Sequence, residues 1–307
     1  MISFEEARSI VLNNVQIGPK TRVRLEKLLG SILAEPVLAS HDLPHFDNSA
    51  VDGFAICLAD ILDASEQNAI ELPVAGEIRA GDVVPASIPS GSVYKIFTGA
   101  PVPSGTDAIV MREYCTENGT TVKIAKRPGP GENIRRRGEE FLRGKQILTE
   151  GMRVTPSVVG LLASLGQASF MVRKKPTVAI VTTGNELIKP GKNLTSGKIY
   201  DSNSFALTAA LESLGIDEFL PLHSREDHSE TTKVLGLALD FADVVITAGG
   251  VSVGDHDYVK PVLEELGVKT MVYKVAMKPG KPFYFGIAPV NKKGKRQYIF
   301  GLPGNPV

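Results

Sequence analysis

The sequence of 307 residues contains no tryptophan and only two cysteines, and aromatic residues make up 6% of it. Its 34 basic and 34 acidic side chains cancel, which excludes a globally basic nucleic-acid binder. Cys57 and Cys115 lack C-x-x-C spacing and a histidine at ligand spacing, so we expect reduced, structural thiols. No apolar run approaches the roughly 18 residues that span a bilayer, and no secretory signal is recognisable. We therefore expect a cytoplasmic protein with no nucleic-acid and no membrane partner.

Several motifs of nucleotide, metal and hydrolase sites are also missing. The five histidines show no paired-ligand spacing, which disfavours zinc, and neither a P-loop nor a G-x-G-x-x-G after a strand is present. Residues 250–254 match G-x-S-x-G, but a serine hydrolase needs an acid and then a histidine downstream, and the last histidine, His256, is too near. The glycines of residues 249–254 instead predict an anion cradle at a helix N-terminus.

Zero net charge conceals two blocks of opposite sign. Residues 123–145 hold a basic block against three acids: Lys123, Lys126, Arg127, Arg135, Arg136, Arg137, Arg143 and Lys145. Residues 201–230 hold an acidic block against Arg225 alone: Asp201, Glu212, Asp217, Glu218, Glu226, Asp227 and Glu230. Such runs are ordinarily solvated faces. Alternating blocks also suit a site that binds a polyanion together with a divalent metal.

The pattern along the chain predicts an α/β protein with more than one domain. A capping box at Ser3 and Glu6 predicts an N-terminal helix, and we expect further helices over residues 23–33 and 155–166. Short apolar runs between glycines and prolines predict a small β-rich domain near residues 44–140.

From residue 176 onward, strands alternate with helices, which predicts a parallel sheet covered by helices. Ligands of such sheets bind beyond the carboxyl ends of the strands, so we look for chemistry in residues 183–187 and 249–257. Oxygen ligands are available there: Asp227, Asp255, Asp257 and Glu186 can converge on Mg²⁺, although helix capping explains Asp227 and Asp255 almost as well.

Seven segments, in order, resemble the molybdopterin molybdenumtransferases of the MoeA and gephyrin E-domain type. Each is weak alone, whereas the ordered set is specific and covers essentially the whole chain. The segments are residues 47–53 (DNSAVDG), 97–101 (FTGAP), 133–139 (NIRRRGE), 183–187 (TGNEL), 249–255 (GGVSVGD), 278–282 (KPGKP) and 302–307 (LPGNPV).

The resemblance implies a fold and a domain division. Residues 1–20 and 175–307 would form a three-layer α/β/α molybdopterin-binding domain with a parallel-rich sheet. Residues 21–43 and 141–174 would form a discontinuous connecting and dimerisation domain, and residues 44–140 a small β-rich domain. The family normally continues past the LPGNPV segment into a C-terminal β-barrel domain, which we expect to be absent because the sequence ends at Val307.

The resemblance also implies an activity, namely the Mg²⁺-assisted insertion of molybdate into adenylylated molybdopterin with release of AMP. It implies a homodimer whose sites lie between the small β-rich domain of one subunit and the α/β domain of the other, with other proteins of molybdenum cofactor biosynthesis as further partners. Two alternatives remain: a molybdopterin adenylyltransferase, which residues 176–307 also resemble, and a scaffold or carrier that binds molybdopterin without turnover.

Site residues carry over from the resemblance position by position. The expected catalytic residues are Asp52, Thr98, Glu186, Asp227 and Asp257, of which Glu186, Asp227 and Asp257 are also the expected metal ligands. The expected substrate-binding residues are Arg135, Gly249, Gly250, Ser252, Lys274, Lys278 and Lys281. In two places the chain departs from the family pattern, with Glu140 and Asn185 where aspartate is common.

Overall fold

The computed structural model describes residues 1–250, 257–290 and 294–305, and its chain divides into two compact units. The first unit contains Met1–Ala34, Arg153–Pro156 and Ser169–Val307. The second contains Glu35–Met152 and Ser157–Ala168. The division into three domains stays a prediction.

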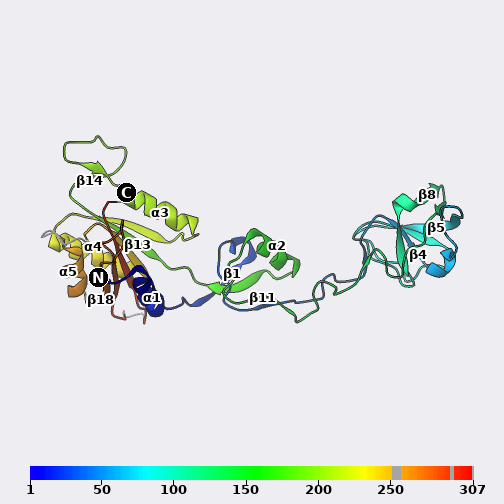
Figure 1. Ribbon diagram of the computed structural model, residues 1–307, viewed down its shortest axis with the longest axis horizontal. Coiled ribbons are helices and arrows are strands. Elements are labelled where there is room, and N and C mark those ends of the chain that lie inside the picture. The colour runs from blue at the N-terminus through cyan, green and yellow to red at the C-terminus, as the bar shows by residue number, and fades with distance from the viewer. Residues whose placement is uncertain (251–256, 291–293, 306–307) are drawn as a thin grey trace. The chain divides into compact units, whose positions relative to one another are not determined.

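The first unit is built on a six-stranded sheet (Figure 1). Its strands lie in the order β16 (Phe219–Ser224), β13 (Val178–Thr183), β17 (Val244–Ala248), β20 (Tyr298–Leu302), β19 (Tyr284–Ile287) and β18 (Lys269–Tyr273). The first four strands are parallel, whereas β19 runs antiparallel to both β20 and β18. The expected parallel-rich sheet is therefore confirmed, with β19 as its one reversed strand.

Helices cover both faces of this sheet because successive strand residues point to opposite sides. Ala179 and Val181 of β13 pack with helices α4 (His228–Phe241) and α5 (Val259–Glu265), whereas Val178 and Ile180 pack with α3 (Asn203–Ser213). Helix α1 (Phe4–Asn14) packs on the side shared with α3, over β18 to β20. The three-layer α/β/α arrangement predicted from the resemblance is thus confirmed.

Helix α1 begins after its predicted capping residue. Ser3 Oγ accepts the N–H of Glu6 at 3.1 Å and starts α1, as the capping box predicted.

The predicted helix over residues 23–33 is wrong. Strand β1 (Lys20–Arg24) instead pairs antiparallel with β12 (Ser169–Arg173), and only a short 3₁₀ turn, η1 (Leu25–Lys27), follows it.

The second unit contains a six-stranded sheet of its own (Figure 1). Its order is β7 (Ala108–Met111), β4 (Gly53–Ile56), β6 (Val93–Ile96), β5 (Ile70–Ile78), β9 (Thr121–Ile124) and β8 (Cys115–Asn118). Alternate residues of β4 enter two different apolar clusters, Phe54 and Ile56 in one and Ala55 in the other. Both faces of the sheet are therefore buried at β4. The sheet confirms a β-rich segment within residues 44–140.

Short elements complete the two units. The second unit adds the ladders β2 (Val37–Leu38) with β11 (Gln146–Leu148) and β3 (Asn48–Ser49) with β10 (Ile134–Arg135), the 3₁₀ turns η2 (Leu58–Ile61) and η3 (Arg112–Tyr114), and nearly all of α2 (Pro156–Ser164). The first adds β14 (Leu187–Ile188) paired with β15 (Ile199–Tyr200). Among the described residues, no helix has the length and apolarity that crossing a lipid bilayer requires.

Candidate active site

The four parallel strands of the first unit end at one edge of the sheet, and hydrogen bonds join the segments that follow them. The N–H of Gly184, after β13, donates to the carbonyl of Ser224 in β16 at 3.3 Å. The N–H of Gly249, after β17, donates to the carbonyl of Leu302 in β20 at 3.1 Å. The carboxyl edge where ligands of such sheets bind is therefore a connected set of turns.

Positions 249 and 250 accept only glycine in this backbone conformation. Gly249 has φ 93° and Gly250 has φ 68°, a region that other residues rarely adopt. A Cβ at Gly249 would lie 2.6 Å from Thr183 Oγ1, and one at Gly250 would lie 2.3 Å from Val259 Cγ2. Because both positions are partly exposed, the turn after β17 presents backbone rather than side chains at the sheet edge. That is the property an anion cradle requires. The rest of the predicted cradle, residues 251–254, lies outside the described residues, so the cradle stays a prediction.

Acidic and amide side chains lie beside this turn, after β13 and β16. The two carboxylate oxygens of Glu186 lie 2.6 and 2.5 Å from the position that a Cβ on Gly184 would take. Asn185 Oδ1 accepts the N–H of Glu226 at 3.3 Å, which ties the segment after β13 to the segment after β16. Asp227 Oδ1 accepts the N–H of Glu230 at 2.8 Å and caps α4. The capping function noted for Asp227 in the sequence is thus present.

The three expected metal ligands do not assemble into a ready site. Asp257 lies immediately before Tyr258 and α5, and it is partly buried. Over residues 1–250, 257–290 and 294–305, no three His, Cys, Asp or Glu side chains come together in a way that could hold a metal ion. Binding of Mg²⁺ by Glu186, Asp227 and Asp257 therefore stays a prediction.

Three lysines expected to bind anions share the loop between β18 and β19. The N–H of Lys274 donates to the carbonyl of Phe283 at 2.8 Å, and the N–H of Val275 donates to the carbonyl of Lys281 at 3.1 Å. These bonds close the base of the loop, while Lys278 and Lys281 are exposed. The Lys274 Nζ lies 4.9 Å from the centre of the Tyr273 ring, a favourable cation–π arrangement.

The lysine loop and the glycine turn lie at the same edge of the sheet. Strand β18 runs in the direction of β20, and the ladder places Tyr273 beside Tyr284, then Gly301, then Thr247. Three strand spacings separate the two loops, which is roughly 14 Å at about 4.8 Å per spacing. A ligand that contacts both must be elongated and must carry negative charge at the lysine end.

Two polar residues at this edge were missed by sequence reasoning. Asp201 Oδ2 accepts the hydroxyl of Thr182 at 3.0 Å, and its Oδ1 accepts the N–H of Ser204 at 3.0 Å, so it links β13 to the start of α3. Asn203 Nδ2 donates to the carbonyl of Gly304 at 2.7 Å. The run Asp201-Ser202-Asn203 before an amphipathic helix was the available signal, because these residue types favour helix starts.

Asp52 and Thr98 are brought together in the second unit. Asp52 precedes β4 and Thr98 follows β6, and these strands are antiparallel neighbours, with Gly53 beside Ile96. The Asp52 Oδ1 accepts the N–H of Thr98 at 2.8 Å and its hydroxyl at 2.7 Å. These two hydrogen bonds, of which the one from the Thr98 amide has the larger effect, hold the pKa of the exposed Asp52 carboxyl below its usual value. The pair therefore presents an ionised carboxylate held in one orientation.

Three arginines of the second unit's basic block form ion pairs with nearby acids. Arg135 forms ion pairs with Glu139, at 3.5 Å, and with Glu140. Arg136 pairs with Asp47 at 2.6 Å, and Arg137 with Asp42 at 2.7 Å. All three arginines are exposed, and exposed ion pairs contribute only about 0–1 kcal/mol, so they are readily exchanged for another anion. Anion binding by Arg135 stays a prediction, as does that by Ser252, which lies outside the described residues.

Comparison with known proteins places these observations in a family. Residues 2–166 match the model of the MoeA N-terminal region (domain I and II), and residues 179–307 match that of a probable molybdopterin binding domain. The chain is 40% identical to the molybdopterin molybdenumtransferase of Haemophilus influenzae, over 100% of this chain and 74% of that protein. It is 38% identical to that of Staphylococcus aureus (strain MRSA252), over 99% of this chain and 71% of that protein.

A solved structure is similar over the same length. The crystal structure of a molybdopterin biosynthesis MoeA protein from Pyrococcus horikoshii matches with a TM-score of 0.78 at 33% identity, over 100% of this chain and 75% of that chain. The matches extend through both units and through every segment that carries the site. The chain therefore belongs to the molybdopterin molybdenumtransferase family.

Proposed function

We propose that this protein is a transferase of molybdenum cofactor biosynthesis that inserts molybdate into adenylylated molybdopterin and releases AMP. Family membership supports the reaction, since the relatives in Haemophilus influenzae and Staphylococcus aureus are named for molybdenum transfer to molybdopterin. The match of residues 179–307 to a probable molybdopterin binding domain supports the substrate.

The observation that carries the proposal is that the glycine turn and the lysine loop lie along one sheet edge. The glycine turn after β17 offers backbone to an anion, and the lysine loop after β18 offers three ammonium groups, three strands away. Adenylylated molybdopterin is an elongated polyanion with a phosphoanhydride between its two parts, so it can contact both features at once. Molybdate, a compact dianion, needs only the lysines.

The side chains at the edge suit separate tasks in this reaction. Lys274, Lys278 and Lys281 would neutralise phosphate or molybdate, because ammonium groups bind such oxyanions as point charges. Glu186, held over Gly184, would aid cleavage of the phosphoanhydride that releases AMP. Asp227 is fixed by its cap bond to Glu230, so its carboxylate keeps one orientation toward a bound group.

The family resemblance adds Mg²⁺, but the described side chains offer no ready three-ligand group for it. We therefore assign no step of the reaction to the metal. If Mg²⁺ nevertheless binds through Glu186, Asp227 and Asp257, AMP release will fall in EDTA and recover on adding Mg²⁺.

We propose further that the active species is a homodimer in which the Asp52–Thr98 pair of one subunit acts at the sheet edge of the other. The pair supports this because it holds an ionised, exposed carboxylate in one orientation in the second unit. Mixing the impaired variants Asp52→Ala and Lys278→Ala would restore part of the lost activity in mixed dimers. No recovery, or a monomer by light scattering, would refute the shared site.

Other proteins of molybdenum cofactor biosynthesis are proposed as transient partners that deliver the substrate.

Incubation with adenylylated molybdopterin, with and without molybdate, tests the reaction. The proposal predicts AMP release that depends on molybdate, together with active molybdenum cofactor. Intact bound ligand without AMP would instead identify a carrier, and consumption of ATP with free molybdopterin would identify an adenylyltransferase.

A further inference from the structure

A cavity of about 580 Å³ lies at the end of the first unit's sheet opposite the candidate active site. Its lining includes Pro176, Val244 and Tyr298, which precede or begin the parallel strands β13, β17 and β20. The six residues of β13 separate the two ends of the sheet by roughly 20 Å, at about 3.3 Å per residue. A ligand here would not touch the turns at the carboxyl edge.

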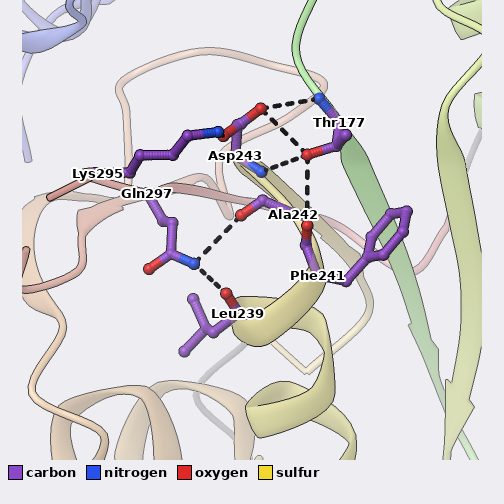
Figure 2. A network of polar contacts seen from close by, with 7 residues as sticks. All are labelled: Thr177, Leu239, Phe241, Ala242, Asp243, Lys295 and Gln297. Carbon is purple, nitrogen blue, oxygen red and sulfur yellow. Dashed lines mark hydrogen bonds and ion pairs between the residues drawn. The ribbon is translucent and has the colours of Figure 1, made fainter. Parts of the chain in front are cut away.

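A network of hydrogen bonds fixes one wall of this cavity (Figure 2). The Asp243 Oδ2 accepts the N–H and the hydroxyl of Thr177, each at 3.1 Å, and Asp243 Oδ1 accepts Lys295 Nζ at 3.0 Å. Gln297 Nε2 donates to the carbonyls of Leu239 and, at 3.2 Å, of Ala242, which ties the end of α4 to the start of β20. The wall is therefore formed before any ligand arrives.

The cavity carries an excess of positive charge. Burial tends to raise the pKa of Asp243, but the Thr177 amide and the Lys295 ammonium outweigh it and hold the pKa below its usual value. Among the described residues that line the cavity, Asp243 is the only acid, and both of its oxygens are already engaged. Lys174, Lys175 and Arg296 also line the cavity, and no ion pair to any of them is found within the part of the chain that the structure describes.

The remaining lining is mainly apolar. Ile17 is 78% exposed and Val15 is 41% exposed, so two branched side chains stand at the cavity without cover. Tyr298 also lines the cavity, and its hydroxyl accepts the N–H of Gln16 at 2.9 Å, which holds the segment after α1 in place. An apolar lining with a few fixed polar groups, within about 300–1,000 Å³, is the usual character of small-molecule sites.

We propose that this cavity is a second binding site, for a small anion with an apolar body. Lys174 and Arg296 hold its carboxylate, phosphate or sulfonate group, and Arg296 can do so through two parallel N–H bonds. The apolar body lies on Val15, Ile17 and Val244. The site does not depend on the function proposed above, because its residues take no part in the candidate active site.

Two fluorescent probes of the same shape test the site. 8-Anilino-1-naphthalenesulfonate carries a sulfonate on an aromatic body, and N-phenyl-1-naphthylamine has that body without charge. In the Lys174→Glu/Arg296→Glu variant, the sulfonate probe should bind at least tenfold more weakly, whereas the neutral probe should change by less than twofold. Ile17→Ser, at an exposed position that folding does not need, should weaken both probes.

The matched control is Arg8→Glu/Lys233→Glu, which reverses the same two charge types at exposed positions outside the cavity. It should leave the affinity of both probes within twofold of the original chain. The proposal is overturned if the two double variants weaken the sulfonate probe equally, which would show a general charge effect. It is also overturned if neither variant changes binding, because the probe then lies elsewhere.

Discussion

Replacing Gly249 by alanine should destabilise the first unit and disturb the glycine turn at its sheet edge. The φ of 93° costs a residue with a Cβ about 1–2 kcal/mol. The added methyl would also lie 2.6 Å from Thr183 Oγ1 and 3.0 Å from the Thr183 carbonyl oxygen. The hydroxyl can rotate away, but the carbonyl is fixed in β13, so a further cost of about 1 kcal/mol follows from overpacking. We expect a total of about 2–3 kcal/mol.

Hydrogen exchange in β13 and β17 measures this change without assuming that the whole chain unfolds in one step. A loss of about 2–3 kcal/mol lowers the protection of their slowest amides roughly 30- to 150-fold, since about 1.4 kcal/mol is a factor of ten. The control is Gly236→Ala inside α4, where a Cβ meets nothing within 4 Å. That variant should be stabilised by about 0.5–1 kcal/mol. Protection in Gly249→Ala equal to that of the original chain would refute the packing argument.

Three further predictions concern single contacts. Thr98→Val removes the hydroxyl bond to Asp52 and keeps the amide bond, so the pKa of Asp52 should rise toward its usual value in a carboxyl NMR titration; unchanged midpoints would contradict it. Because the pKa of Asp52 is lowered in the folded chain, the stability that the Thr98 hydroxyl bond contributes is present at neutral pH and is lost as the pH falls through the Asp52 titration. The variant should therefore be less stable than the original chain at neutral pH, and this difference should vanish at low pH. Asn203→Ala removes the bond to the Gly304 carbonyl, worth about 0.5–1.5 kcal/mol, and should speed exchange in residues 302–304 while Ser213→Ala, at the far end of α3, does not. Burial raises the pKa of the Cys115 thiol to about 12, which leaves about one thiolate in ten thousand at pH 8, so iodoacetamide should modify it only on unfolding, as peptide mass spectrometry would show.

Much of the first unit could be predicted because local signals and tertiary packing agree there. The alternation of strands and helices after residue 176 specified the layers, and the glycines after β17 marked the turn that packing permits only to glycine. The Ser3 cap formed as expected because its partner, Glu6 N–H, is three residues away. These signals lie within a few residues of the features they determine.

The missed features depend on contacts between distant parts of the chain. Residues 20–24 alternate between exposed and half-buried positions because they pair with Ser169–Arg173, and that ladder overrides the helical spacing of the leucines that follow. The bond from Asn203 to Gly304 joins residues about a hundred positions apart.

The most direct test of the account is the rate of molybdate-dependent AMP release in three variants. Lys278→Ala removes an ammonium group from the loop after β18, and Asp257→Ala removes a carboxylate before α5, whereas Lys269→Ala changes an exposed lysine at the opposite end of the same strand. Interactions with charged groups are worth about 1.5–3 kcal/mol, so the first two variants should release AMP roughly ten- to a hundredfold more slowly. Lys269→Ala should stay within twofold of the original rate. Near-normal rates in both Lys278→Ala and Asp257→Ala would contradict the assignment of the reaction to this edge of the sheet.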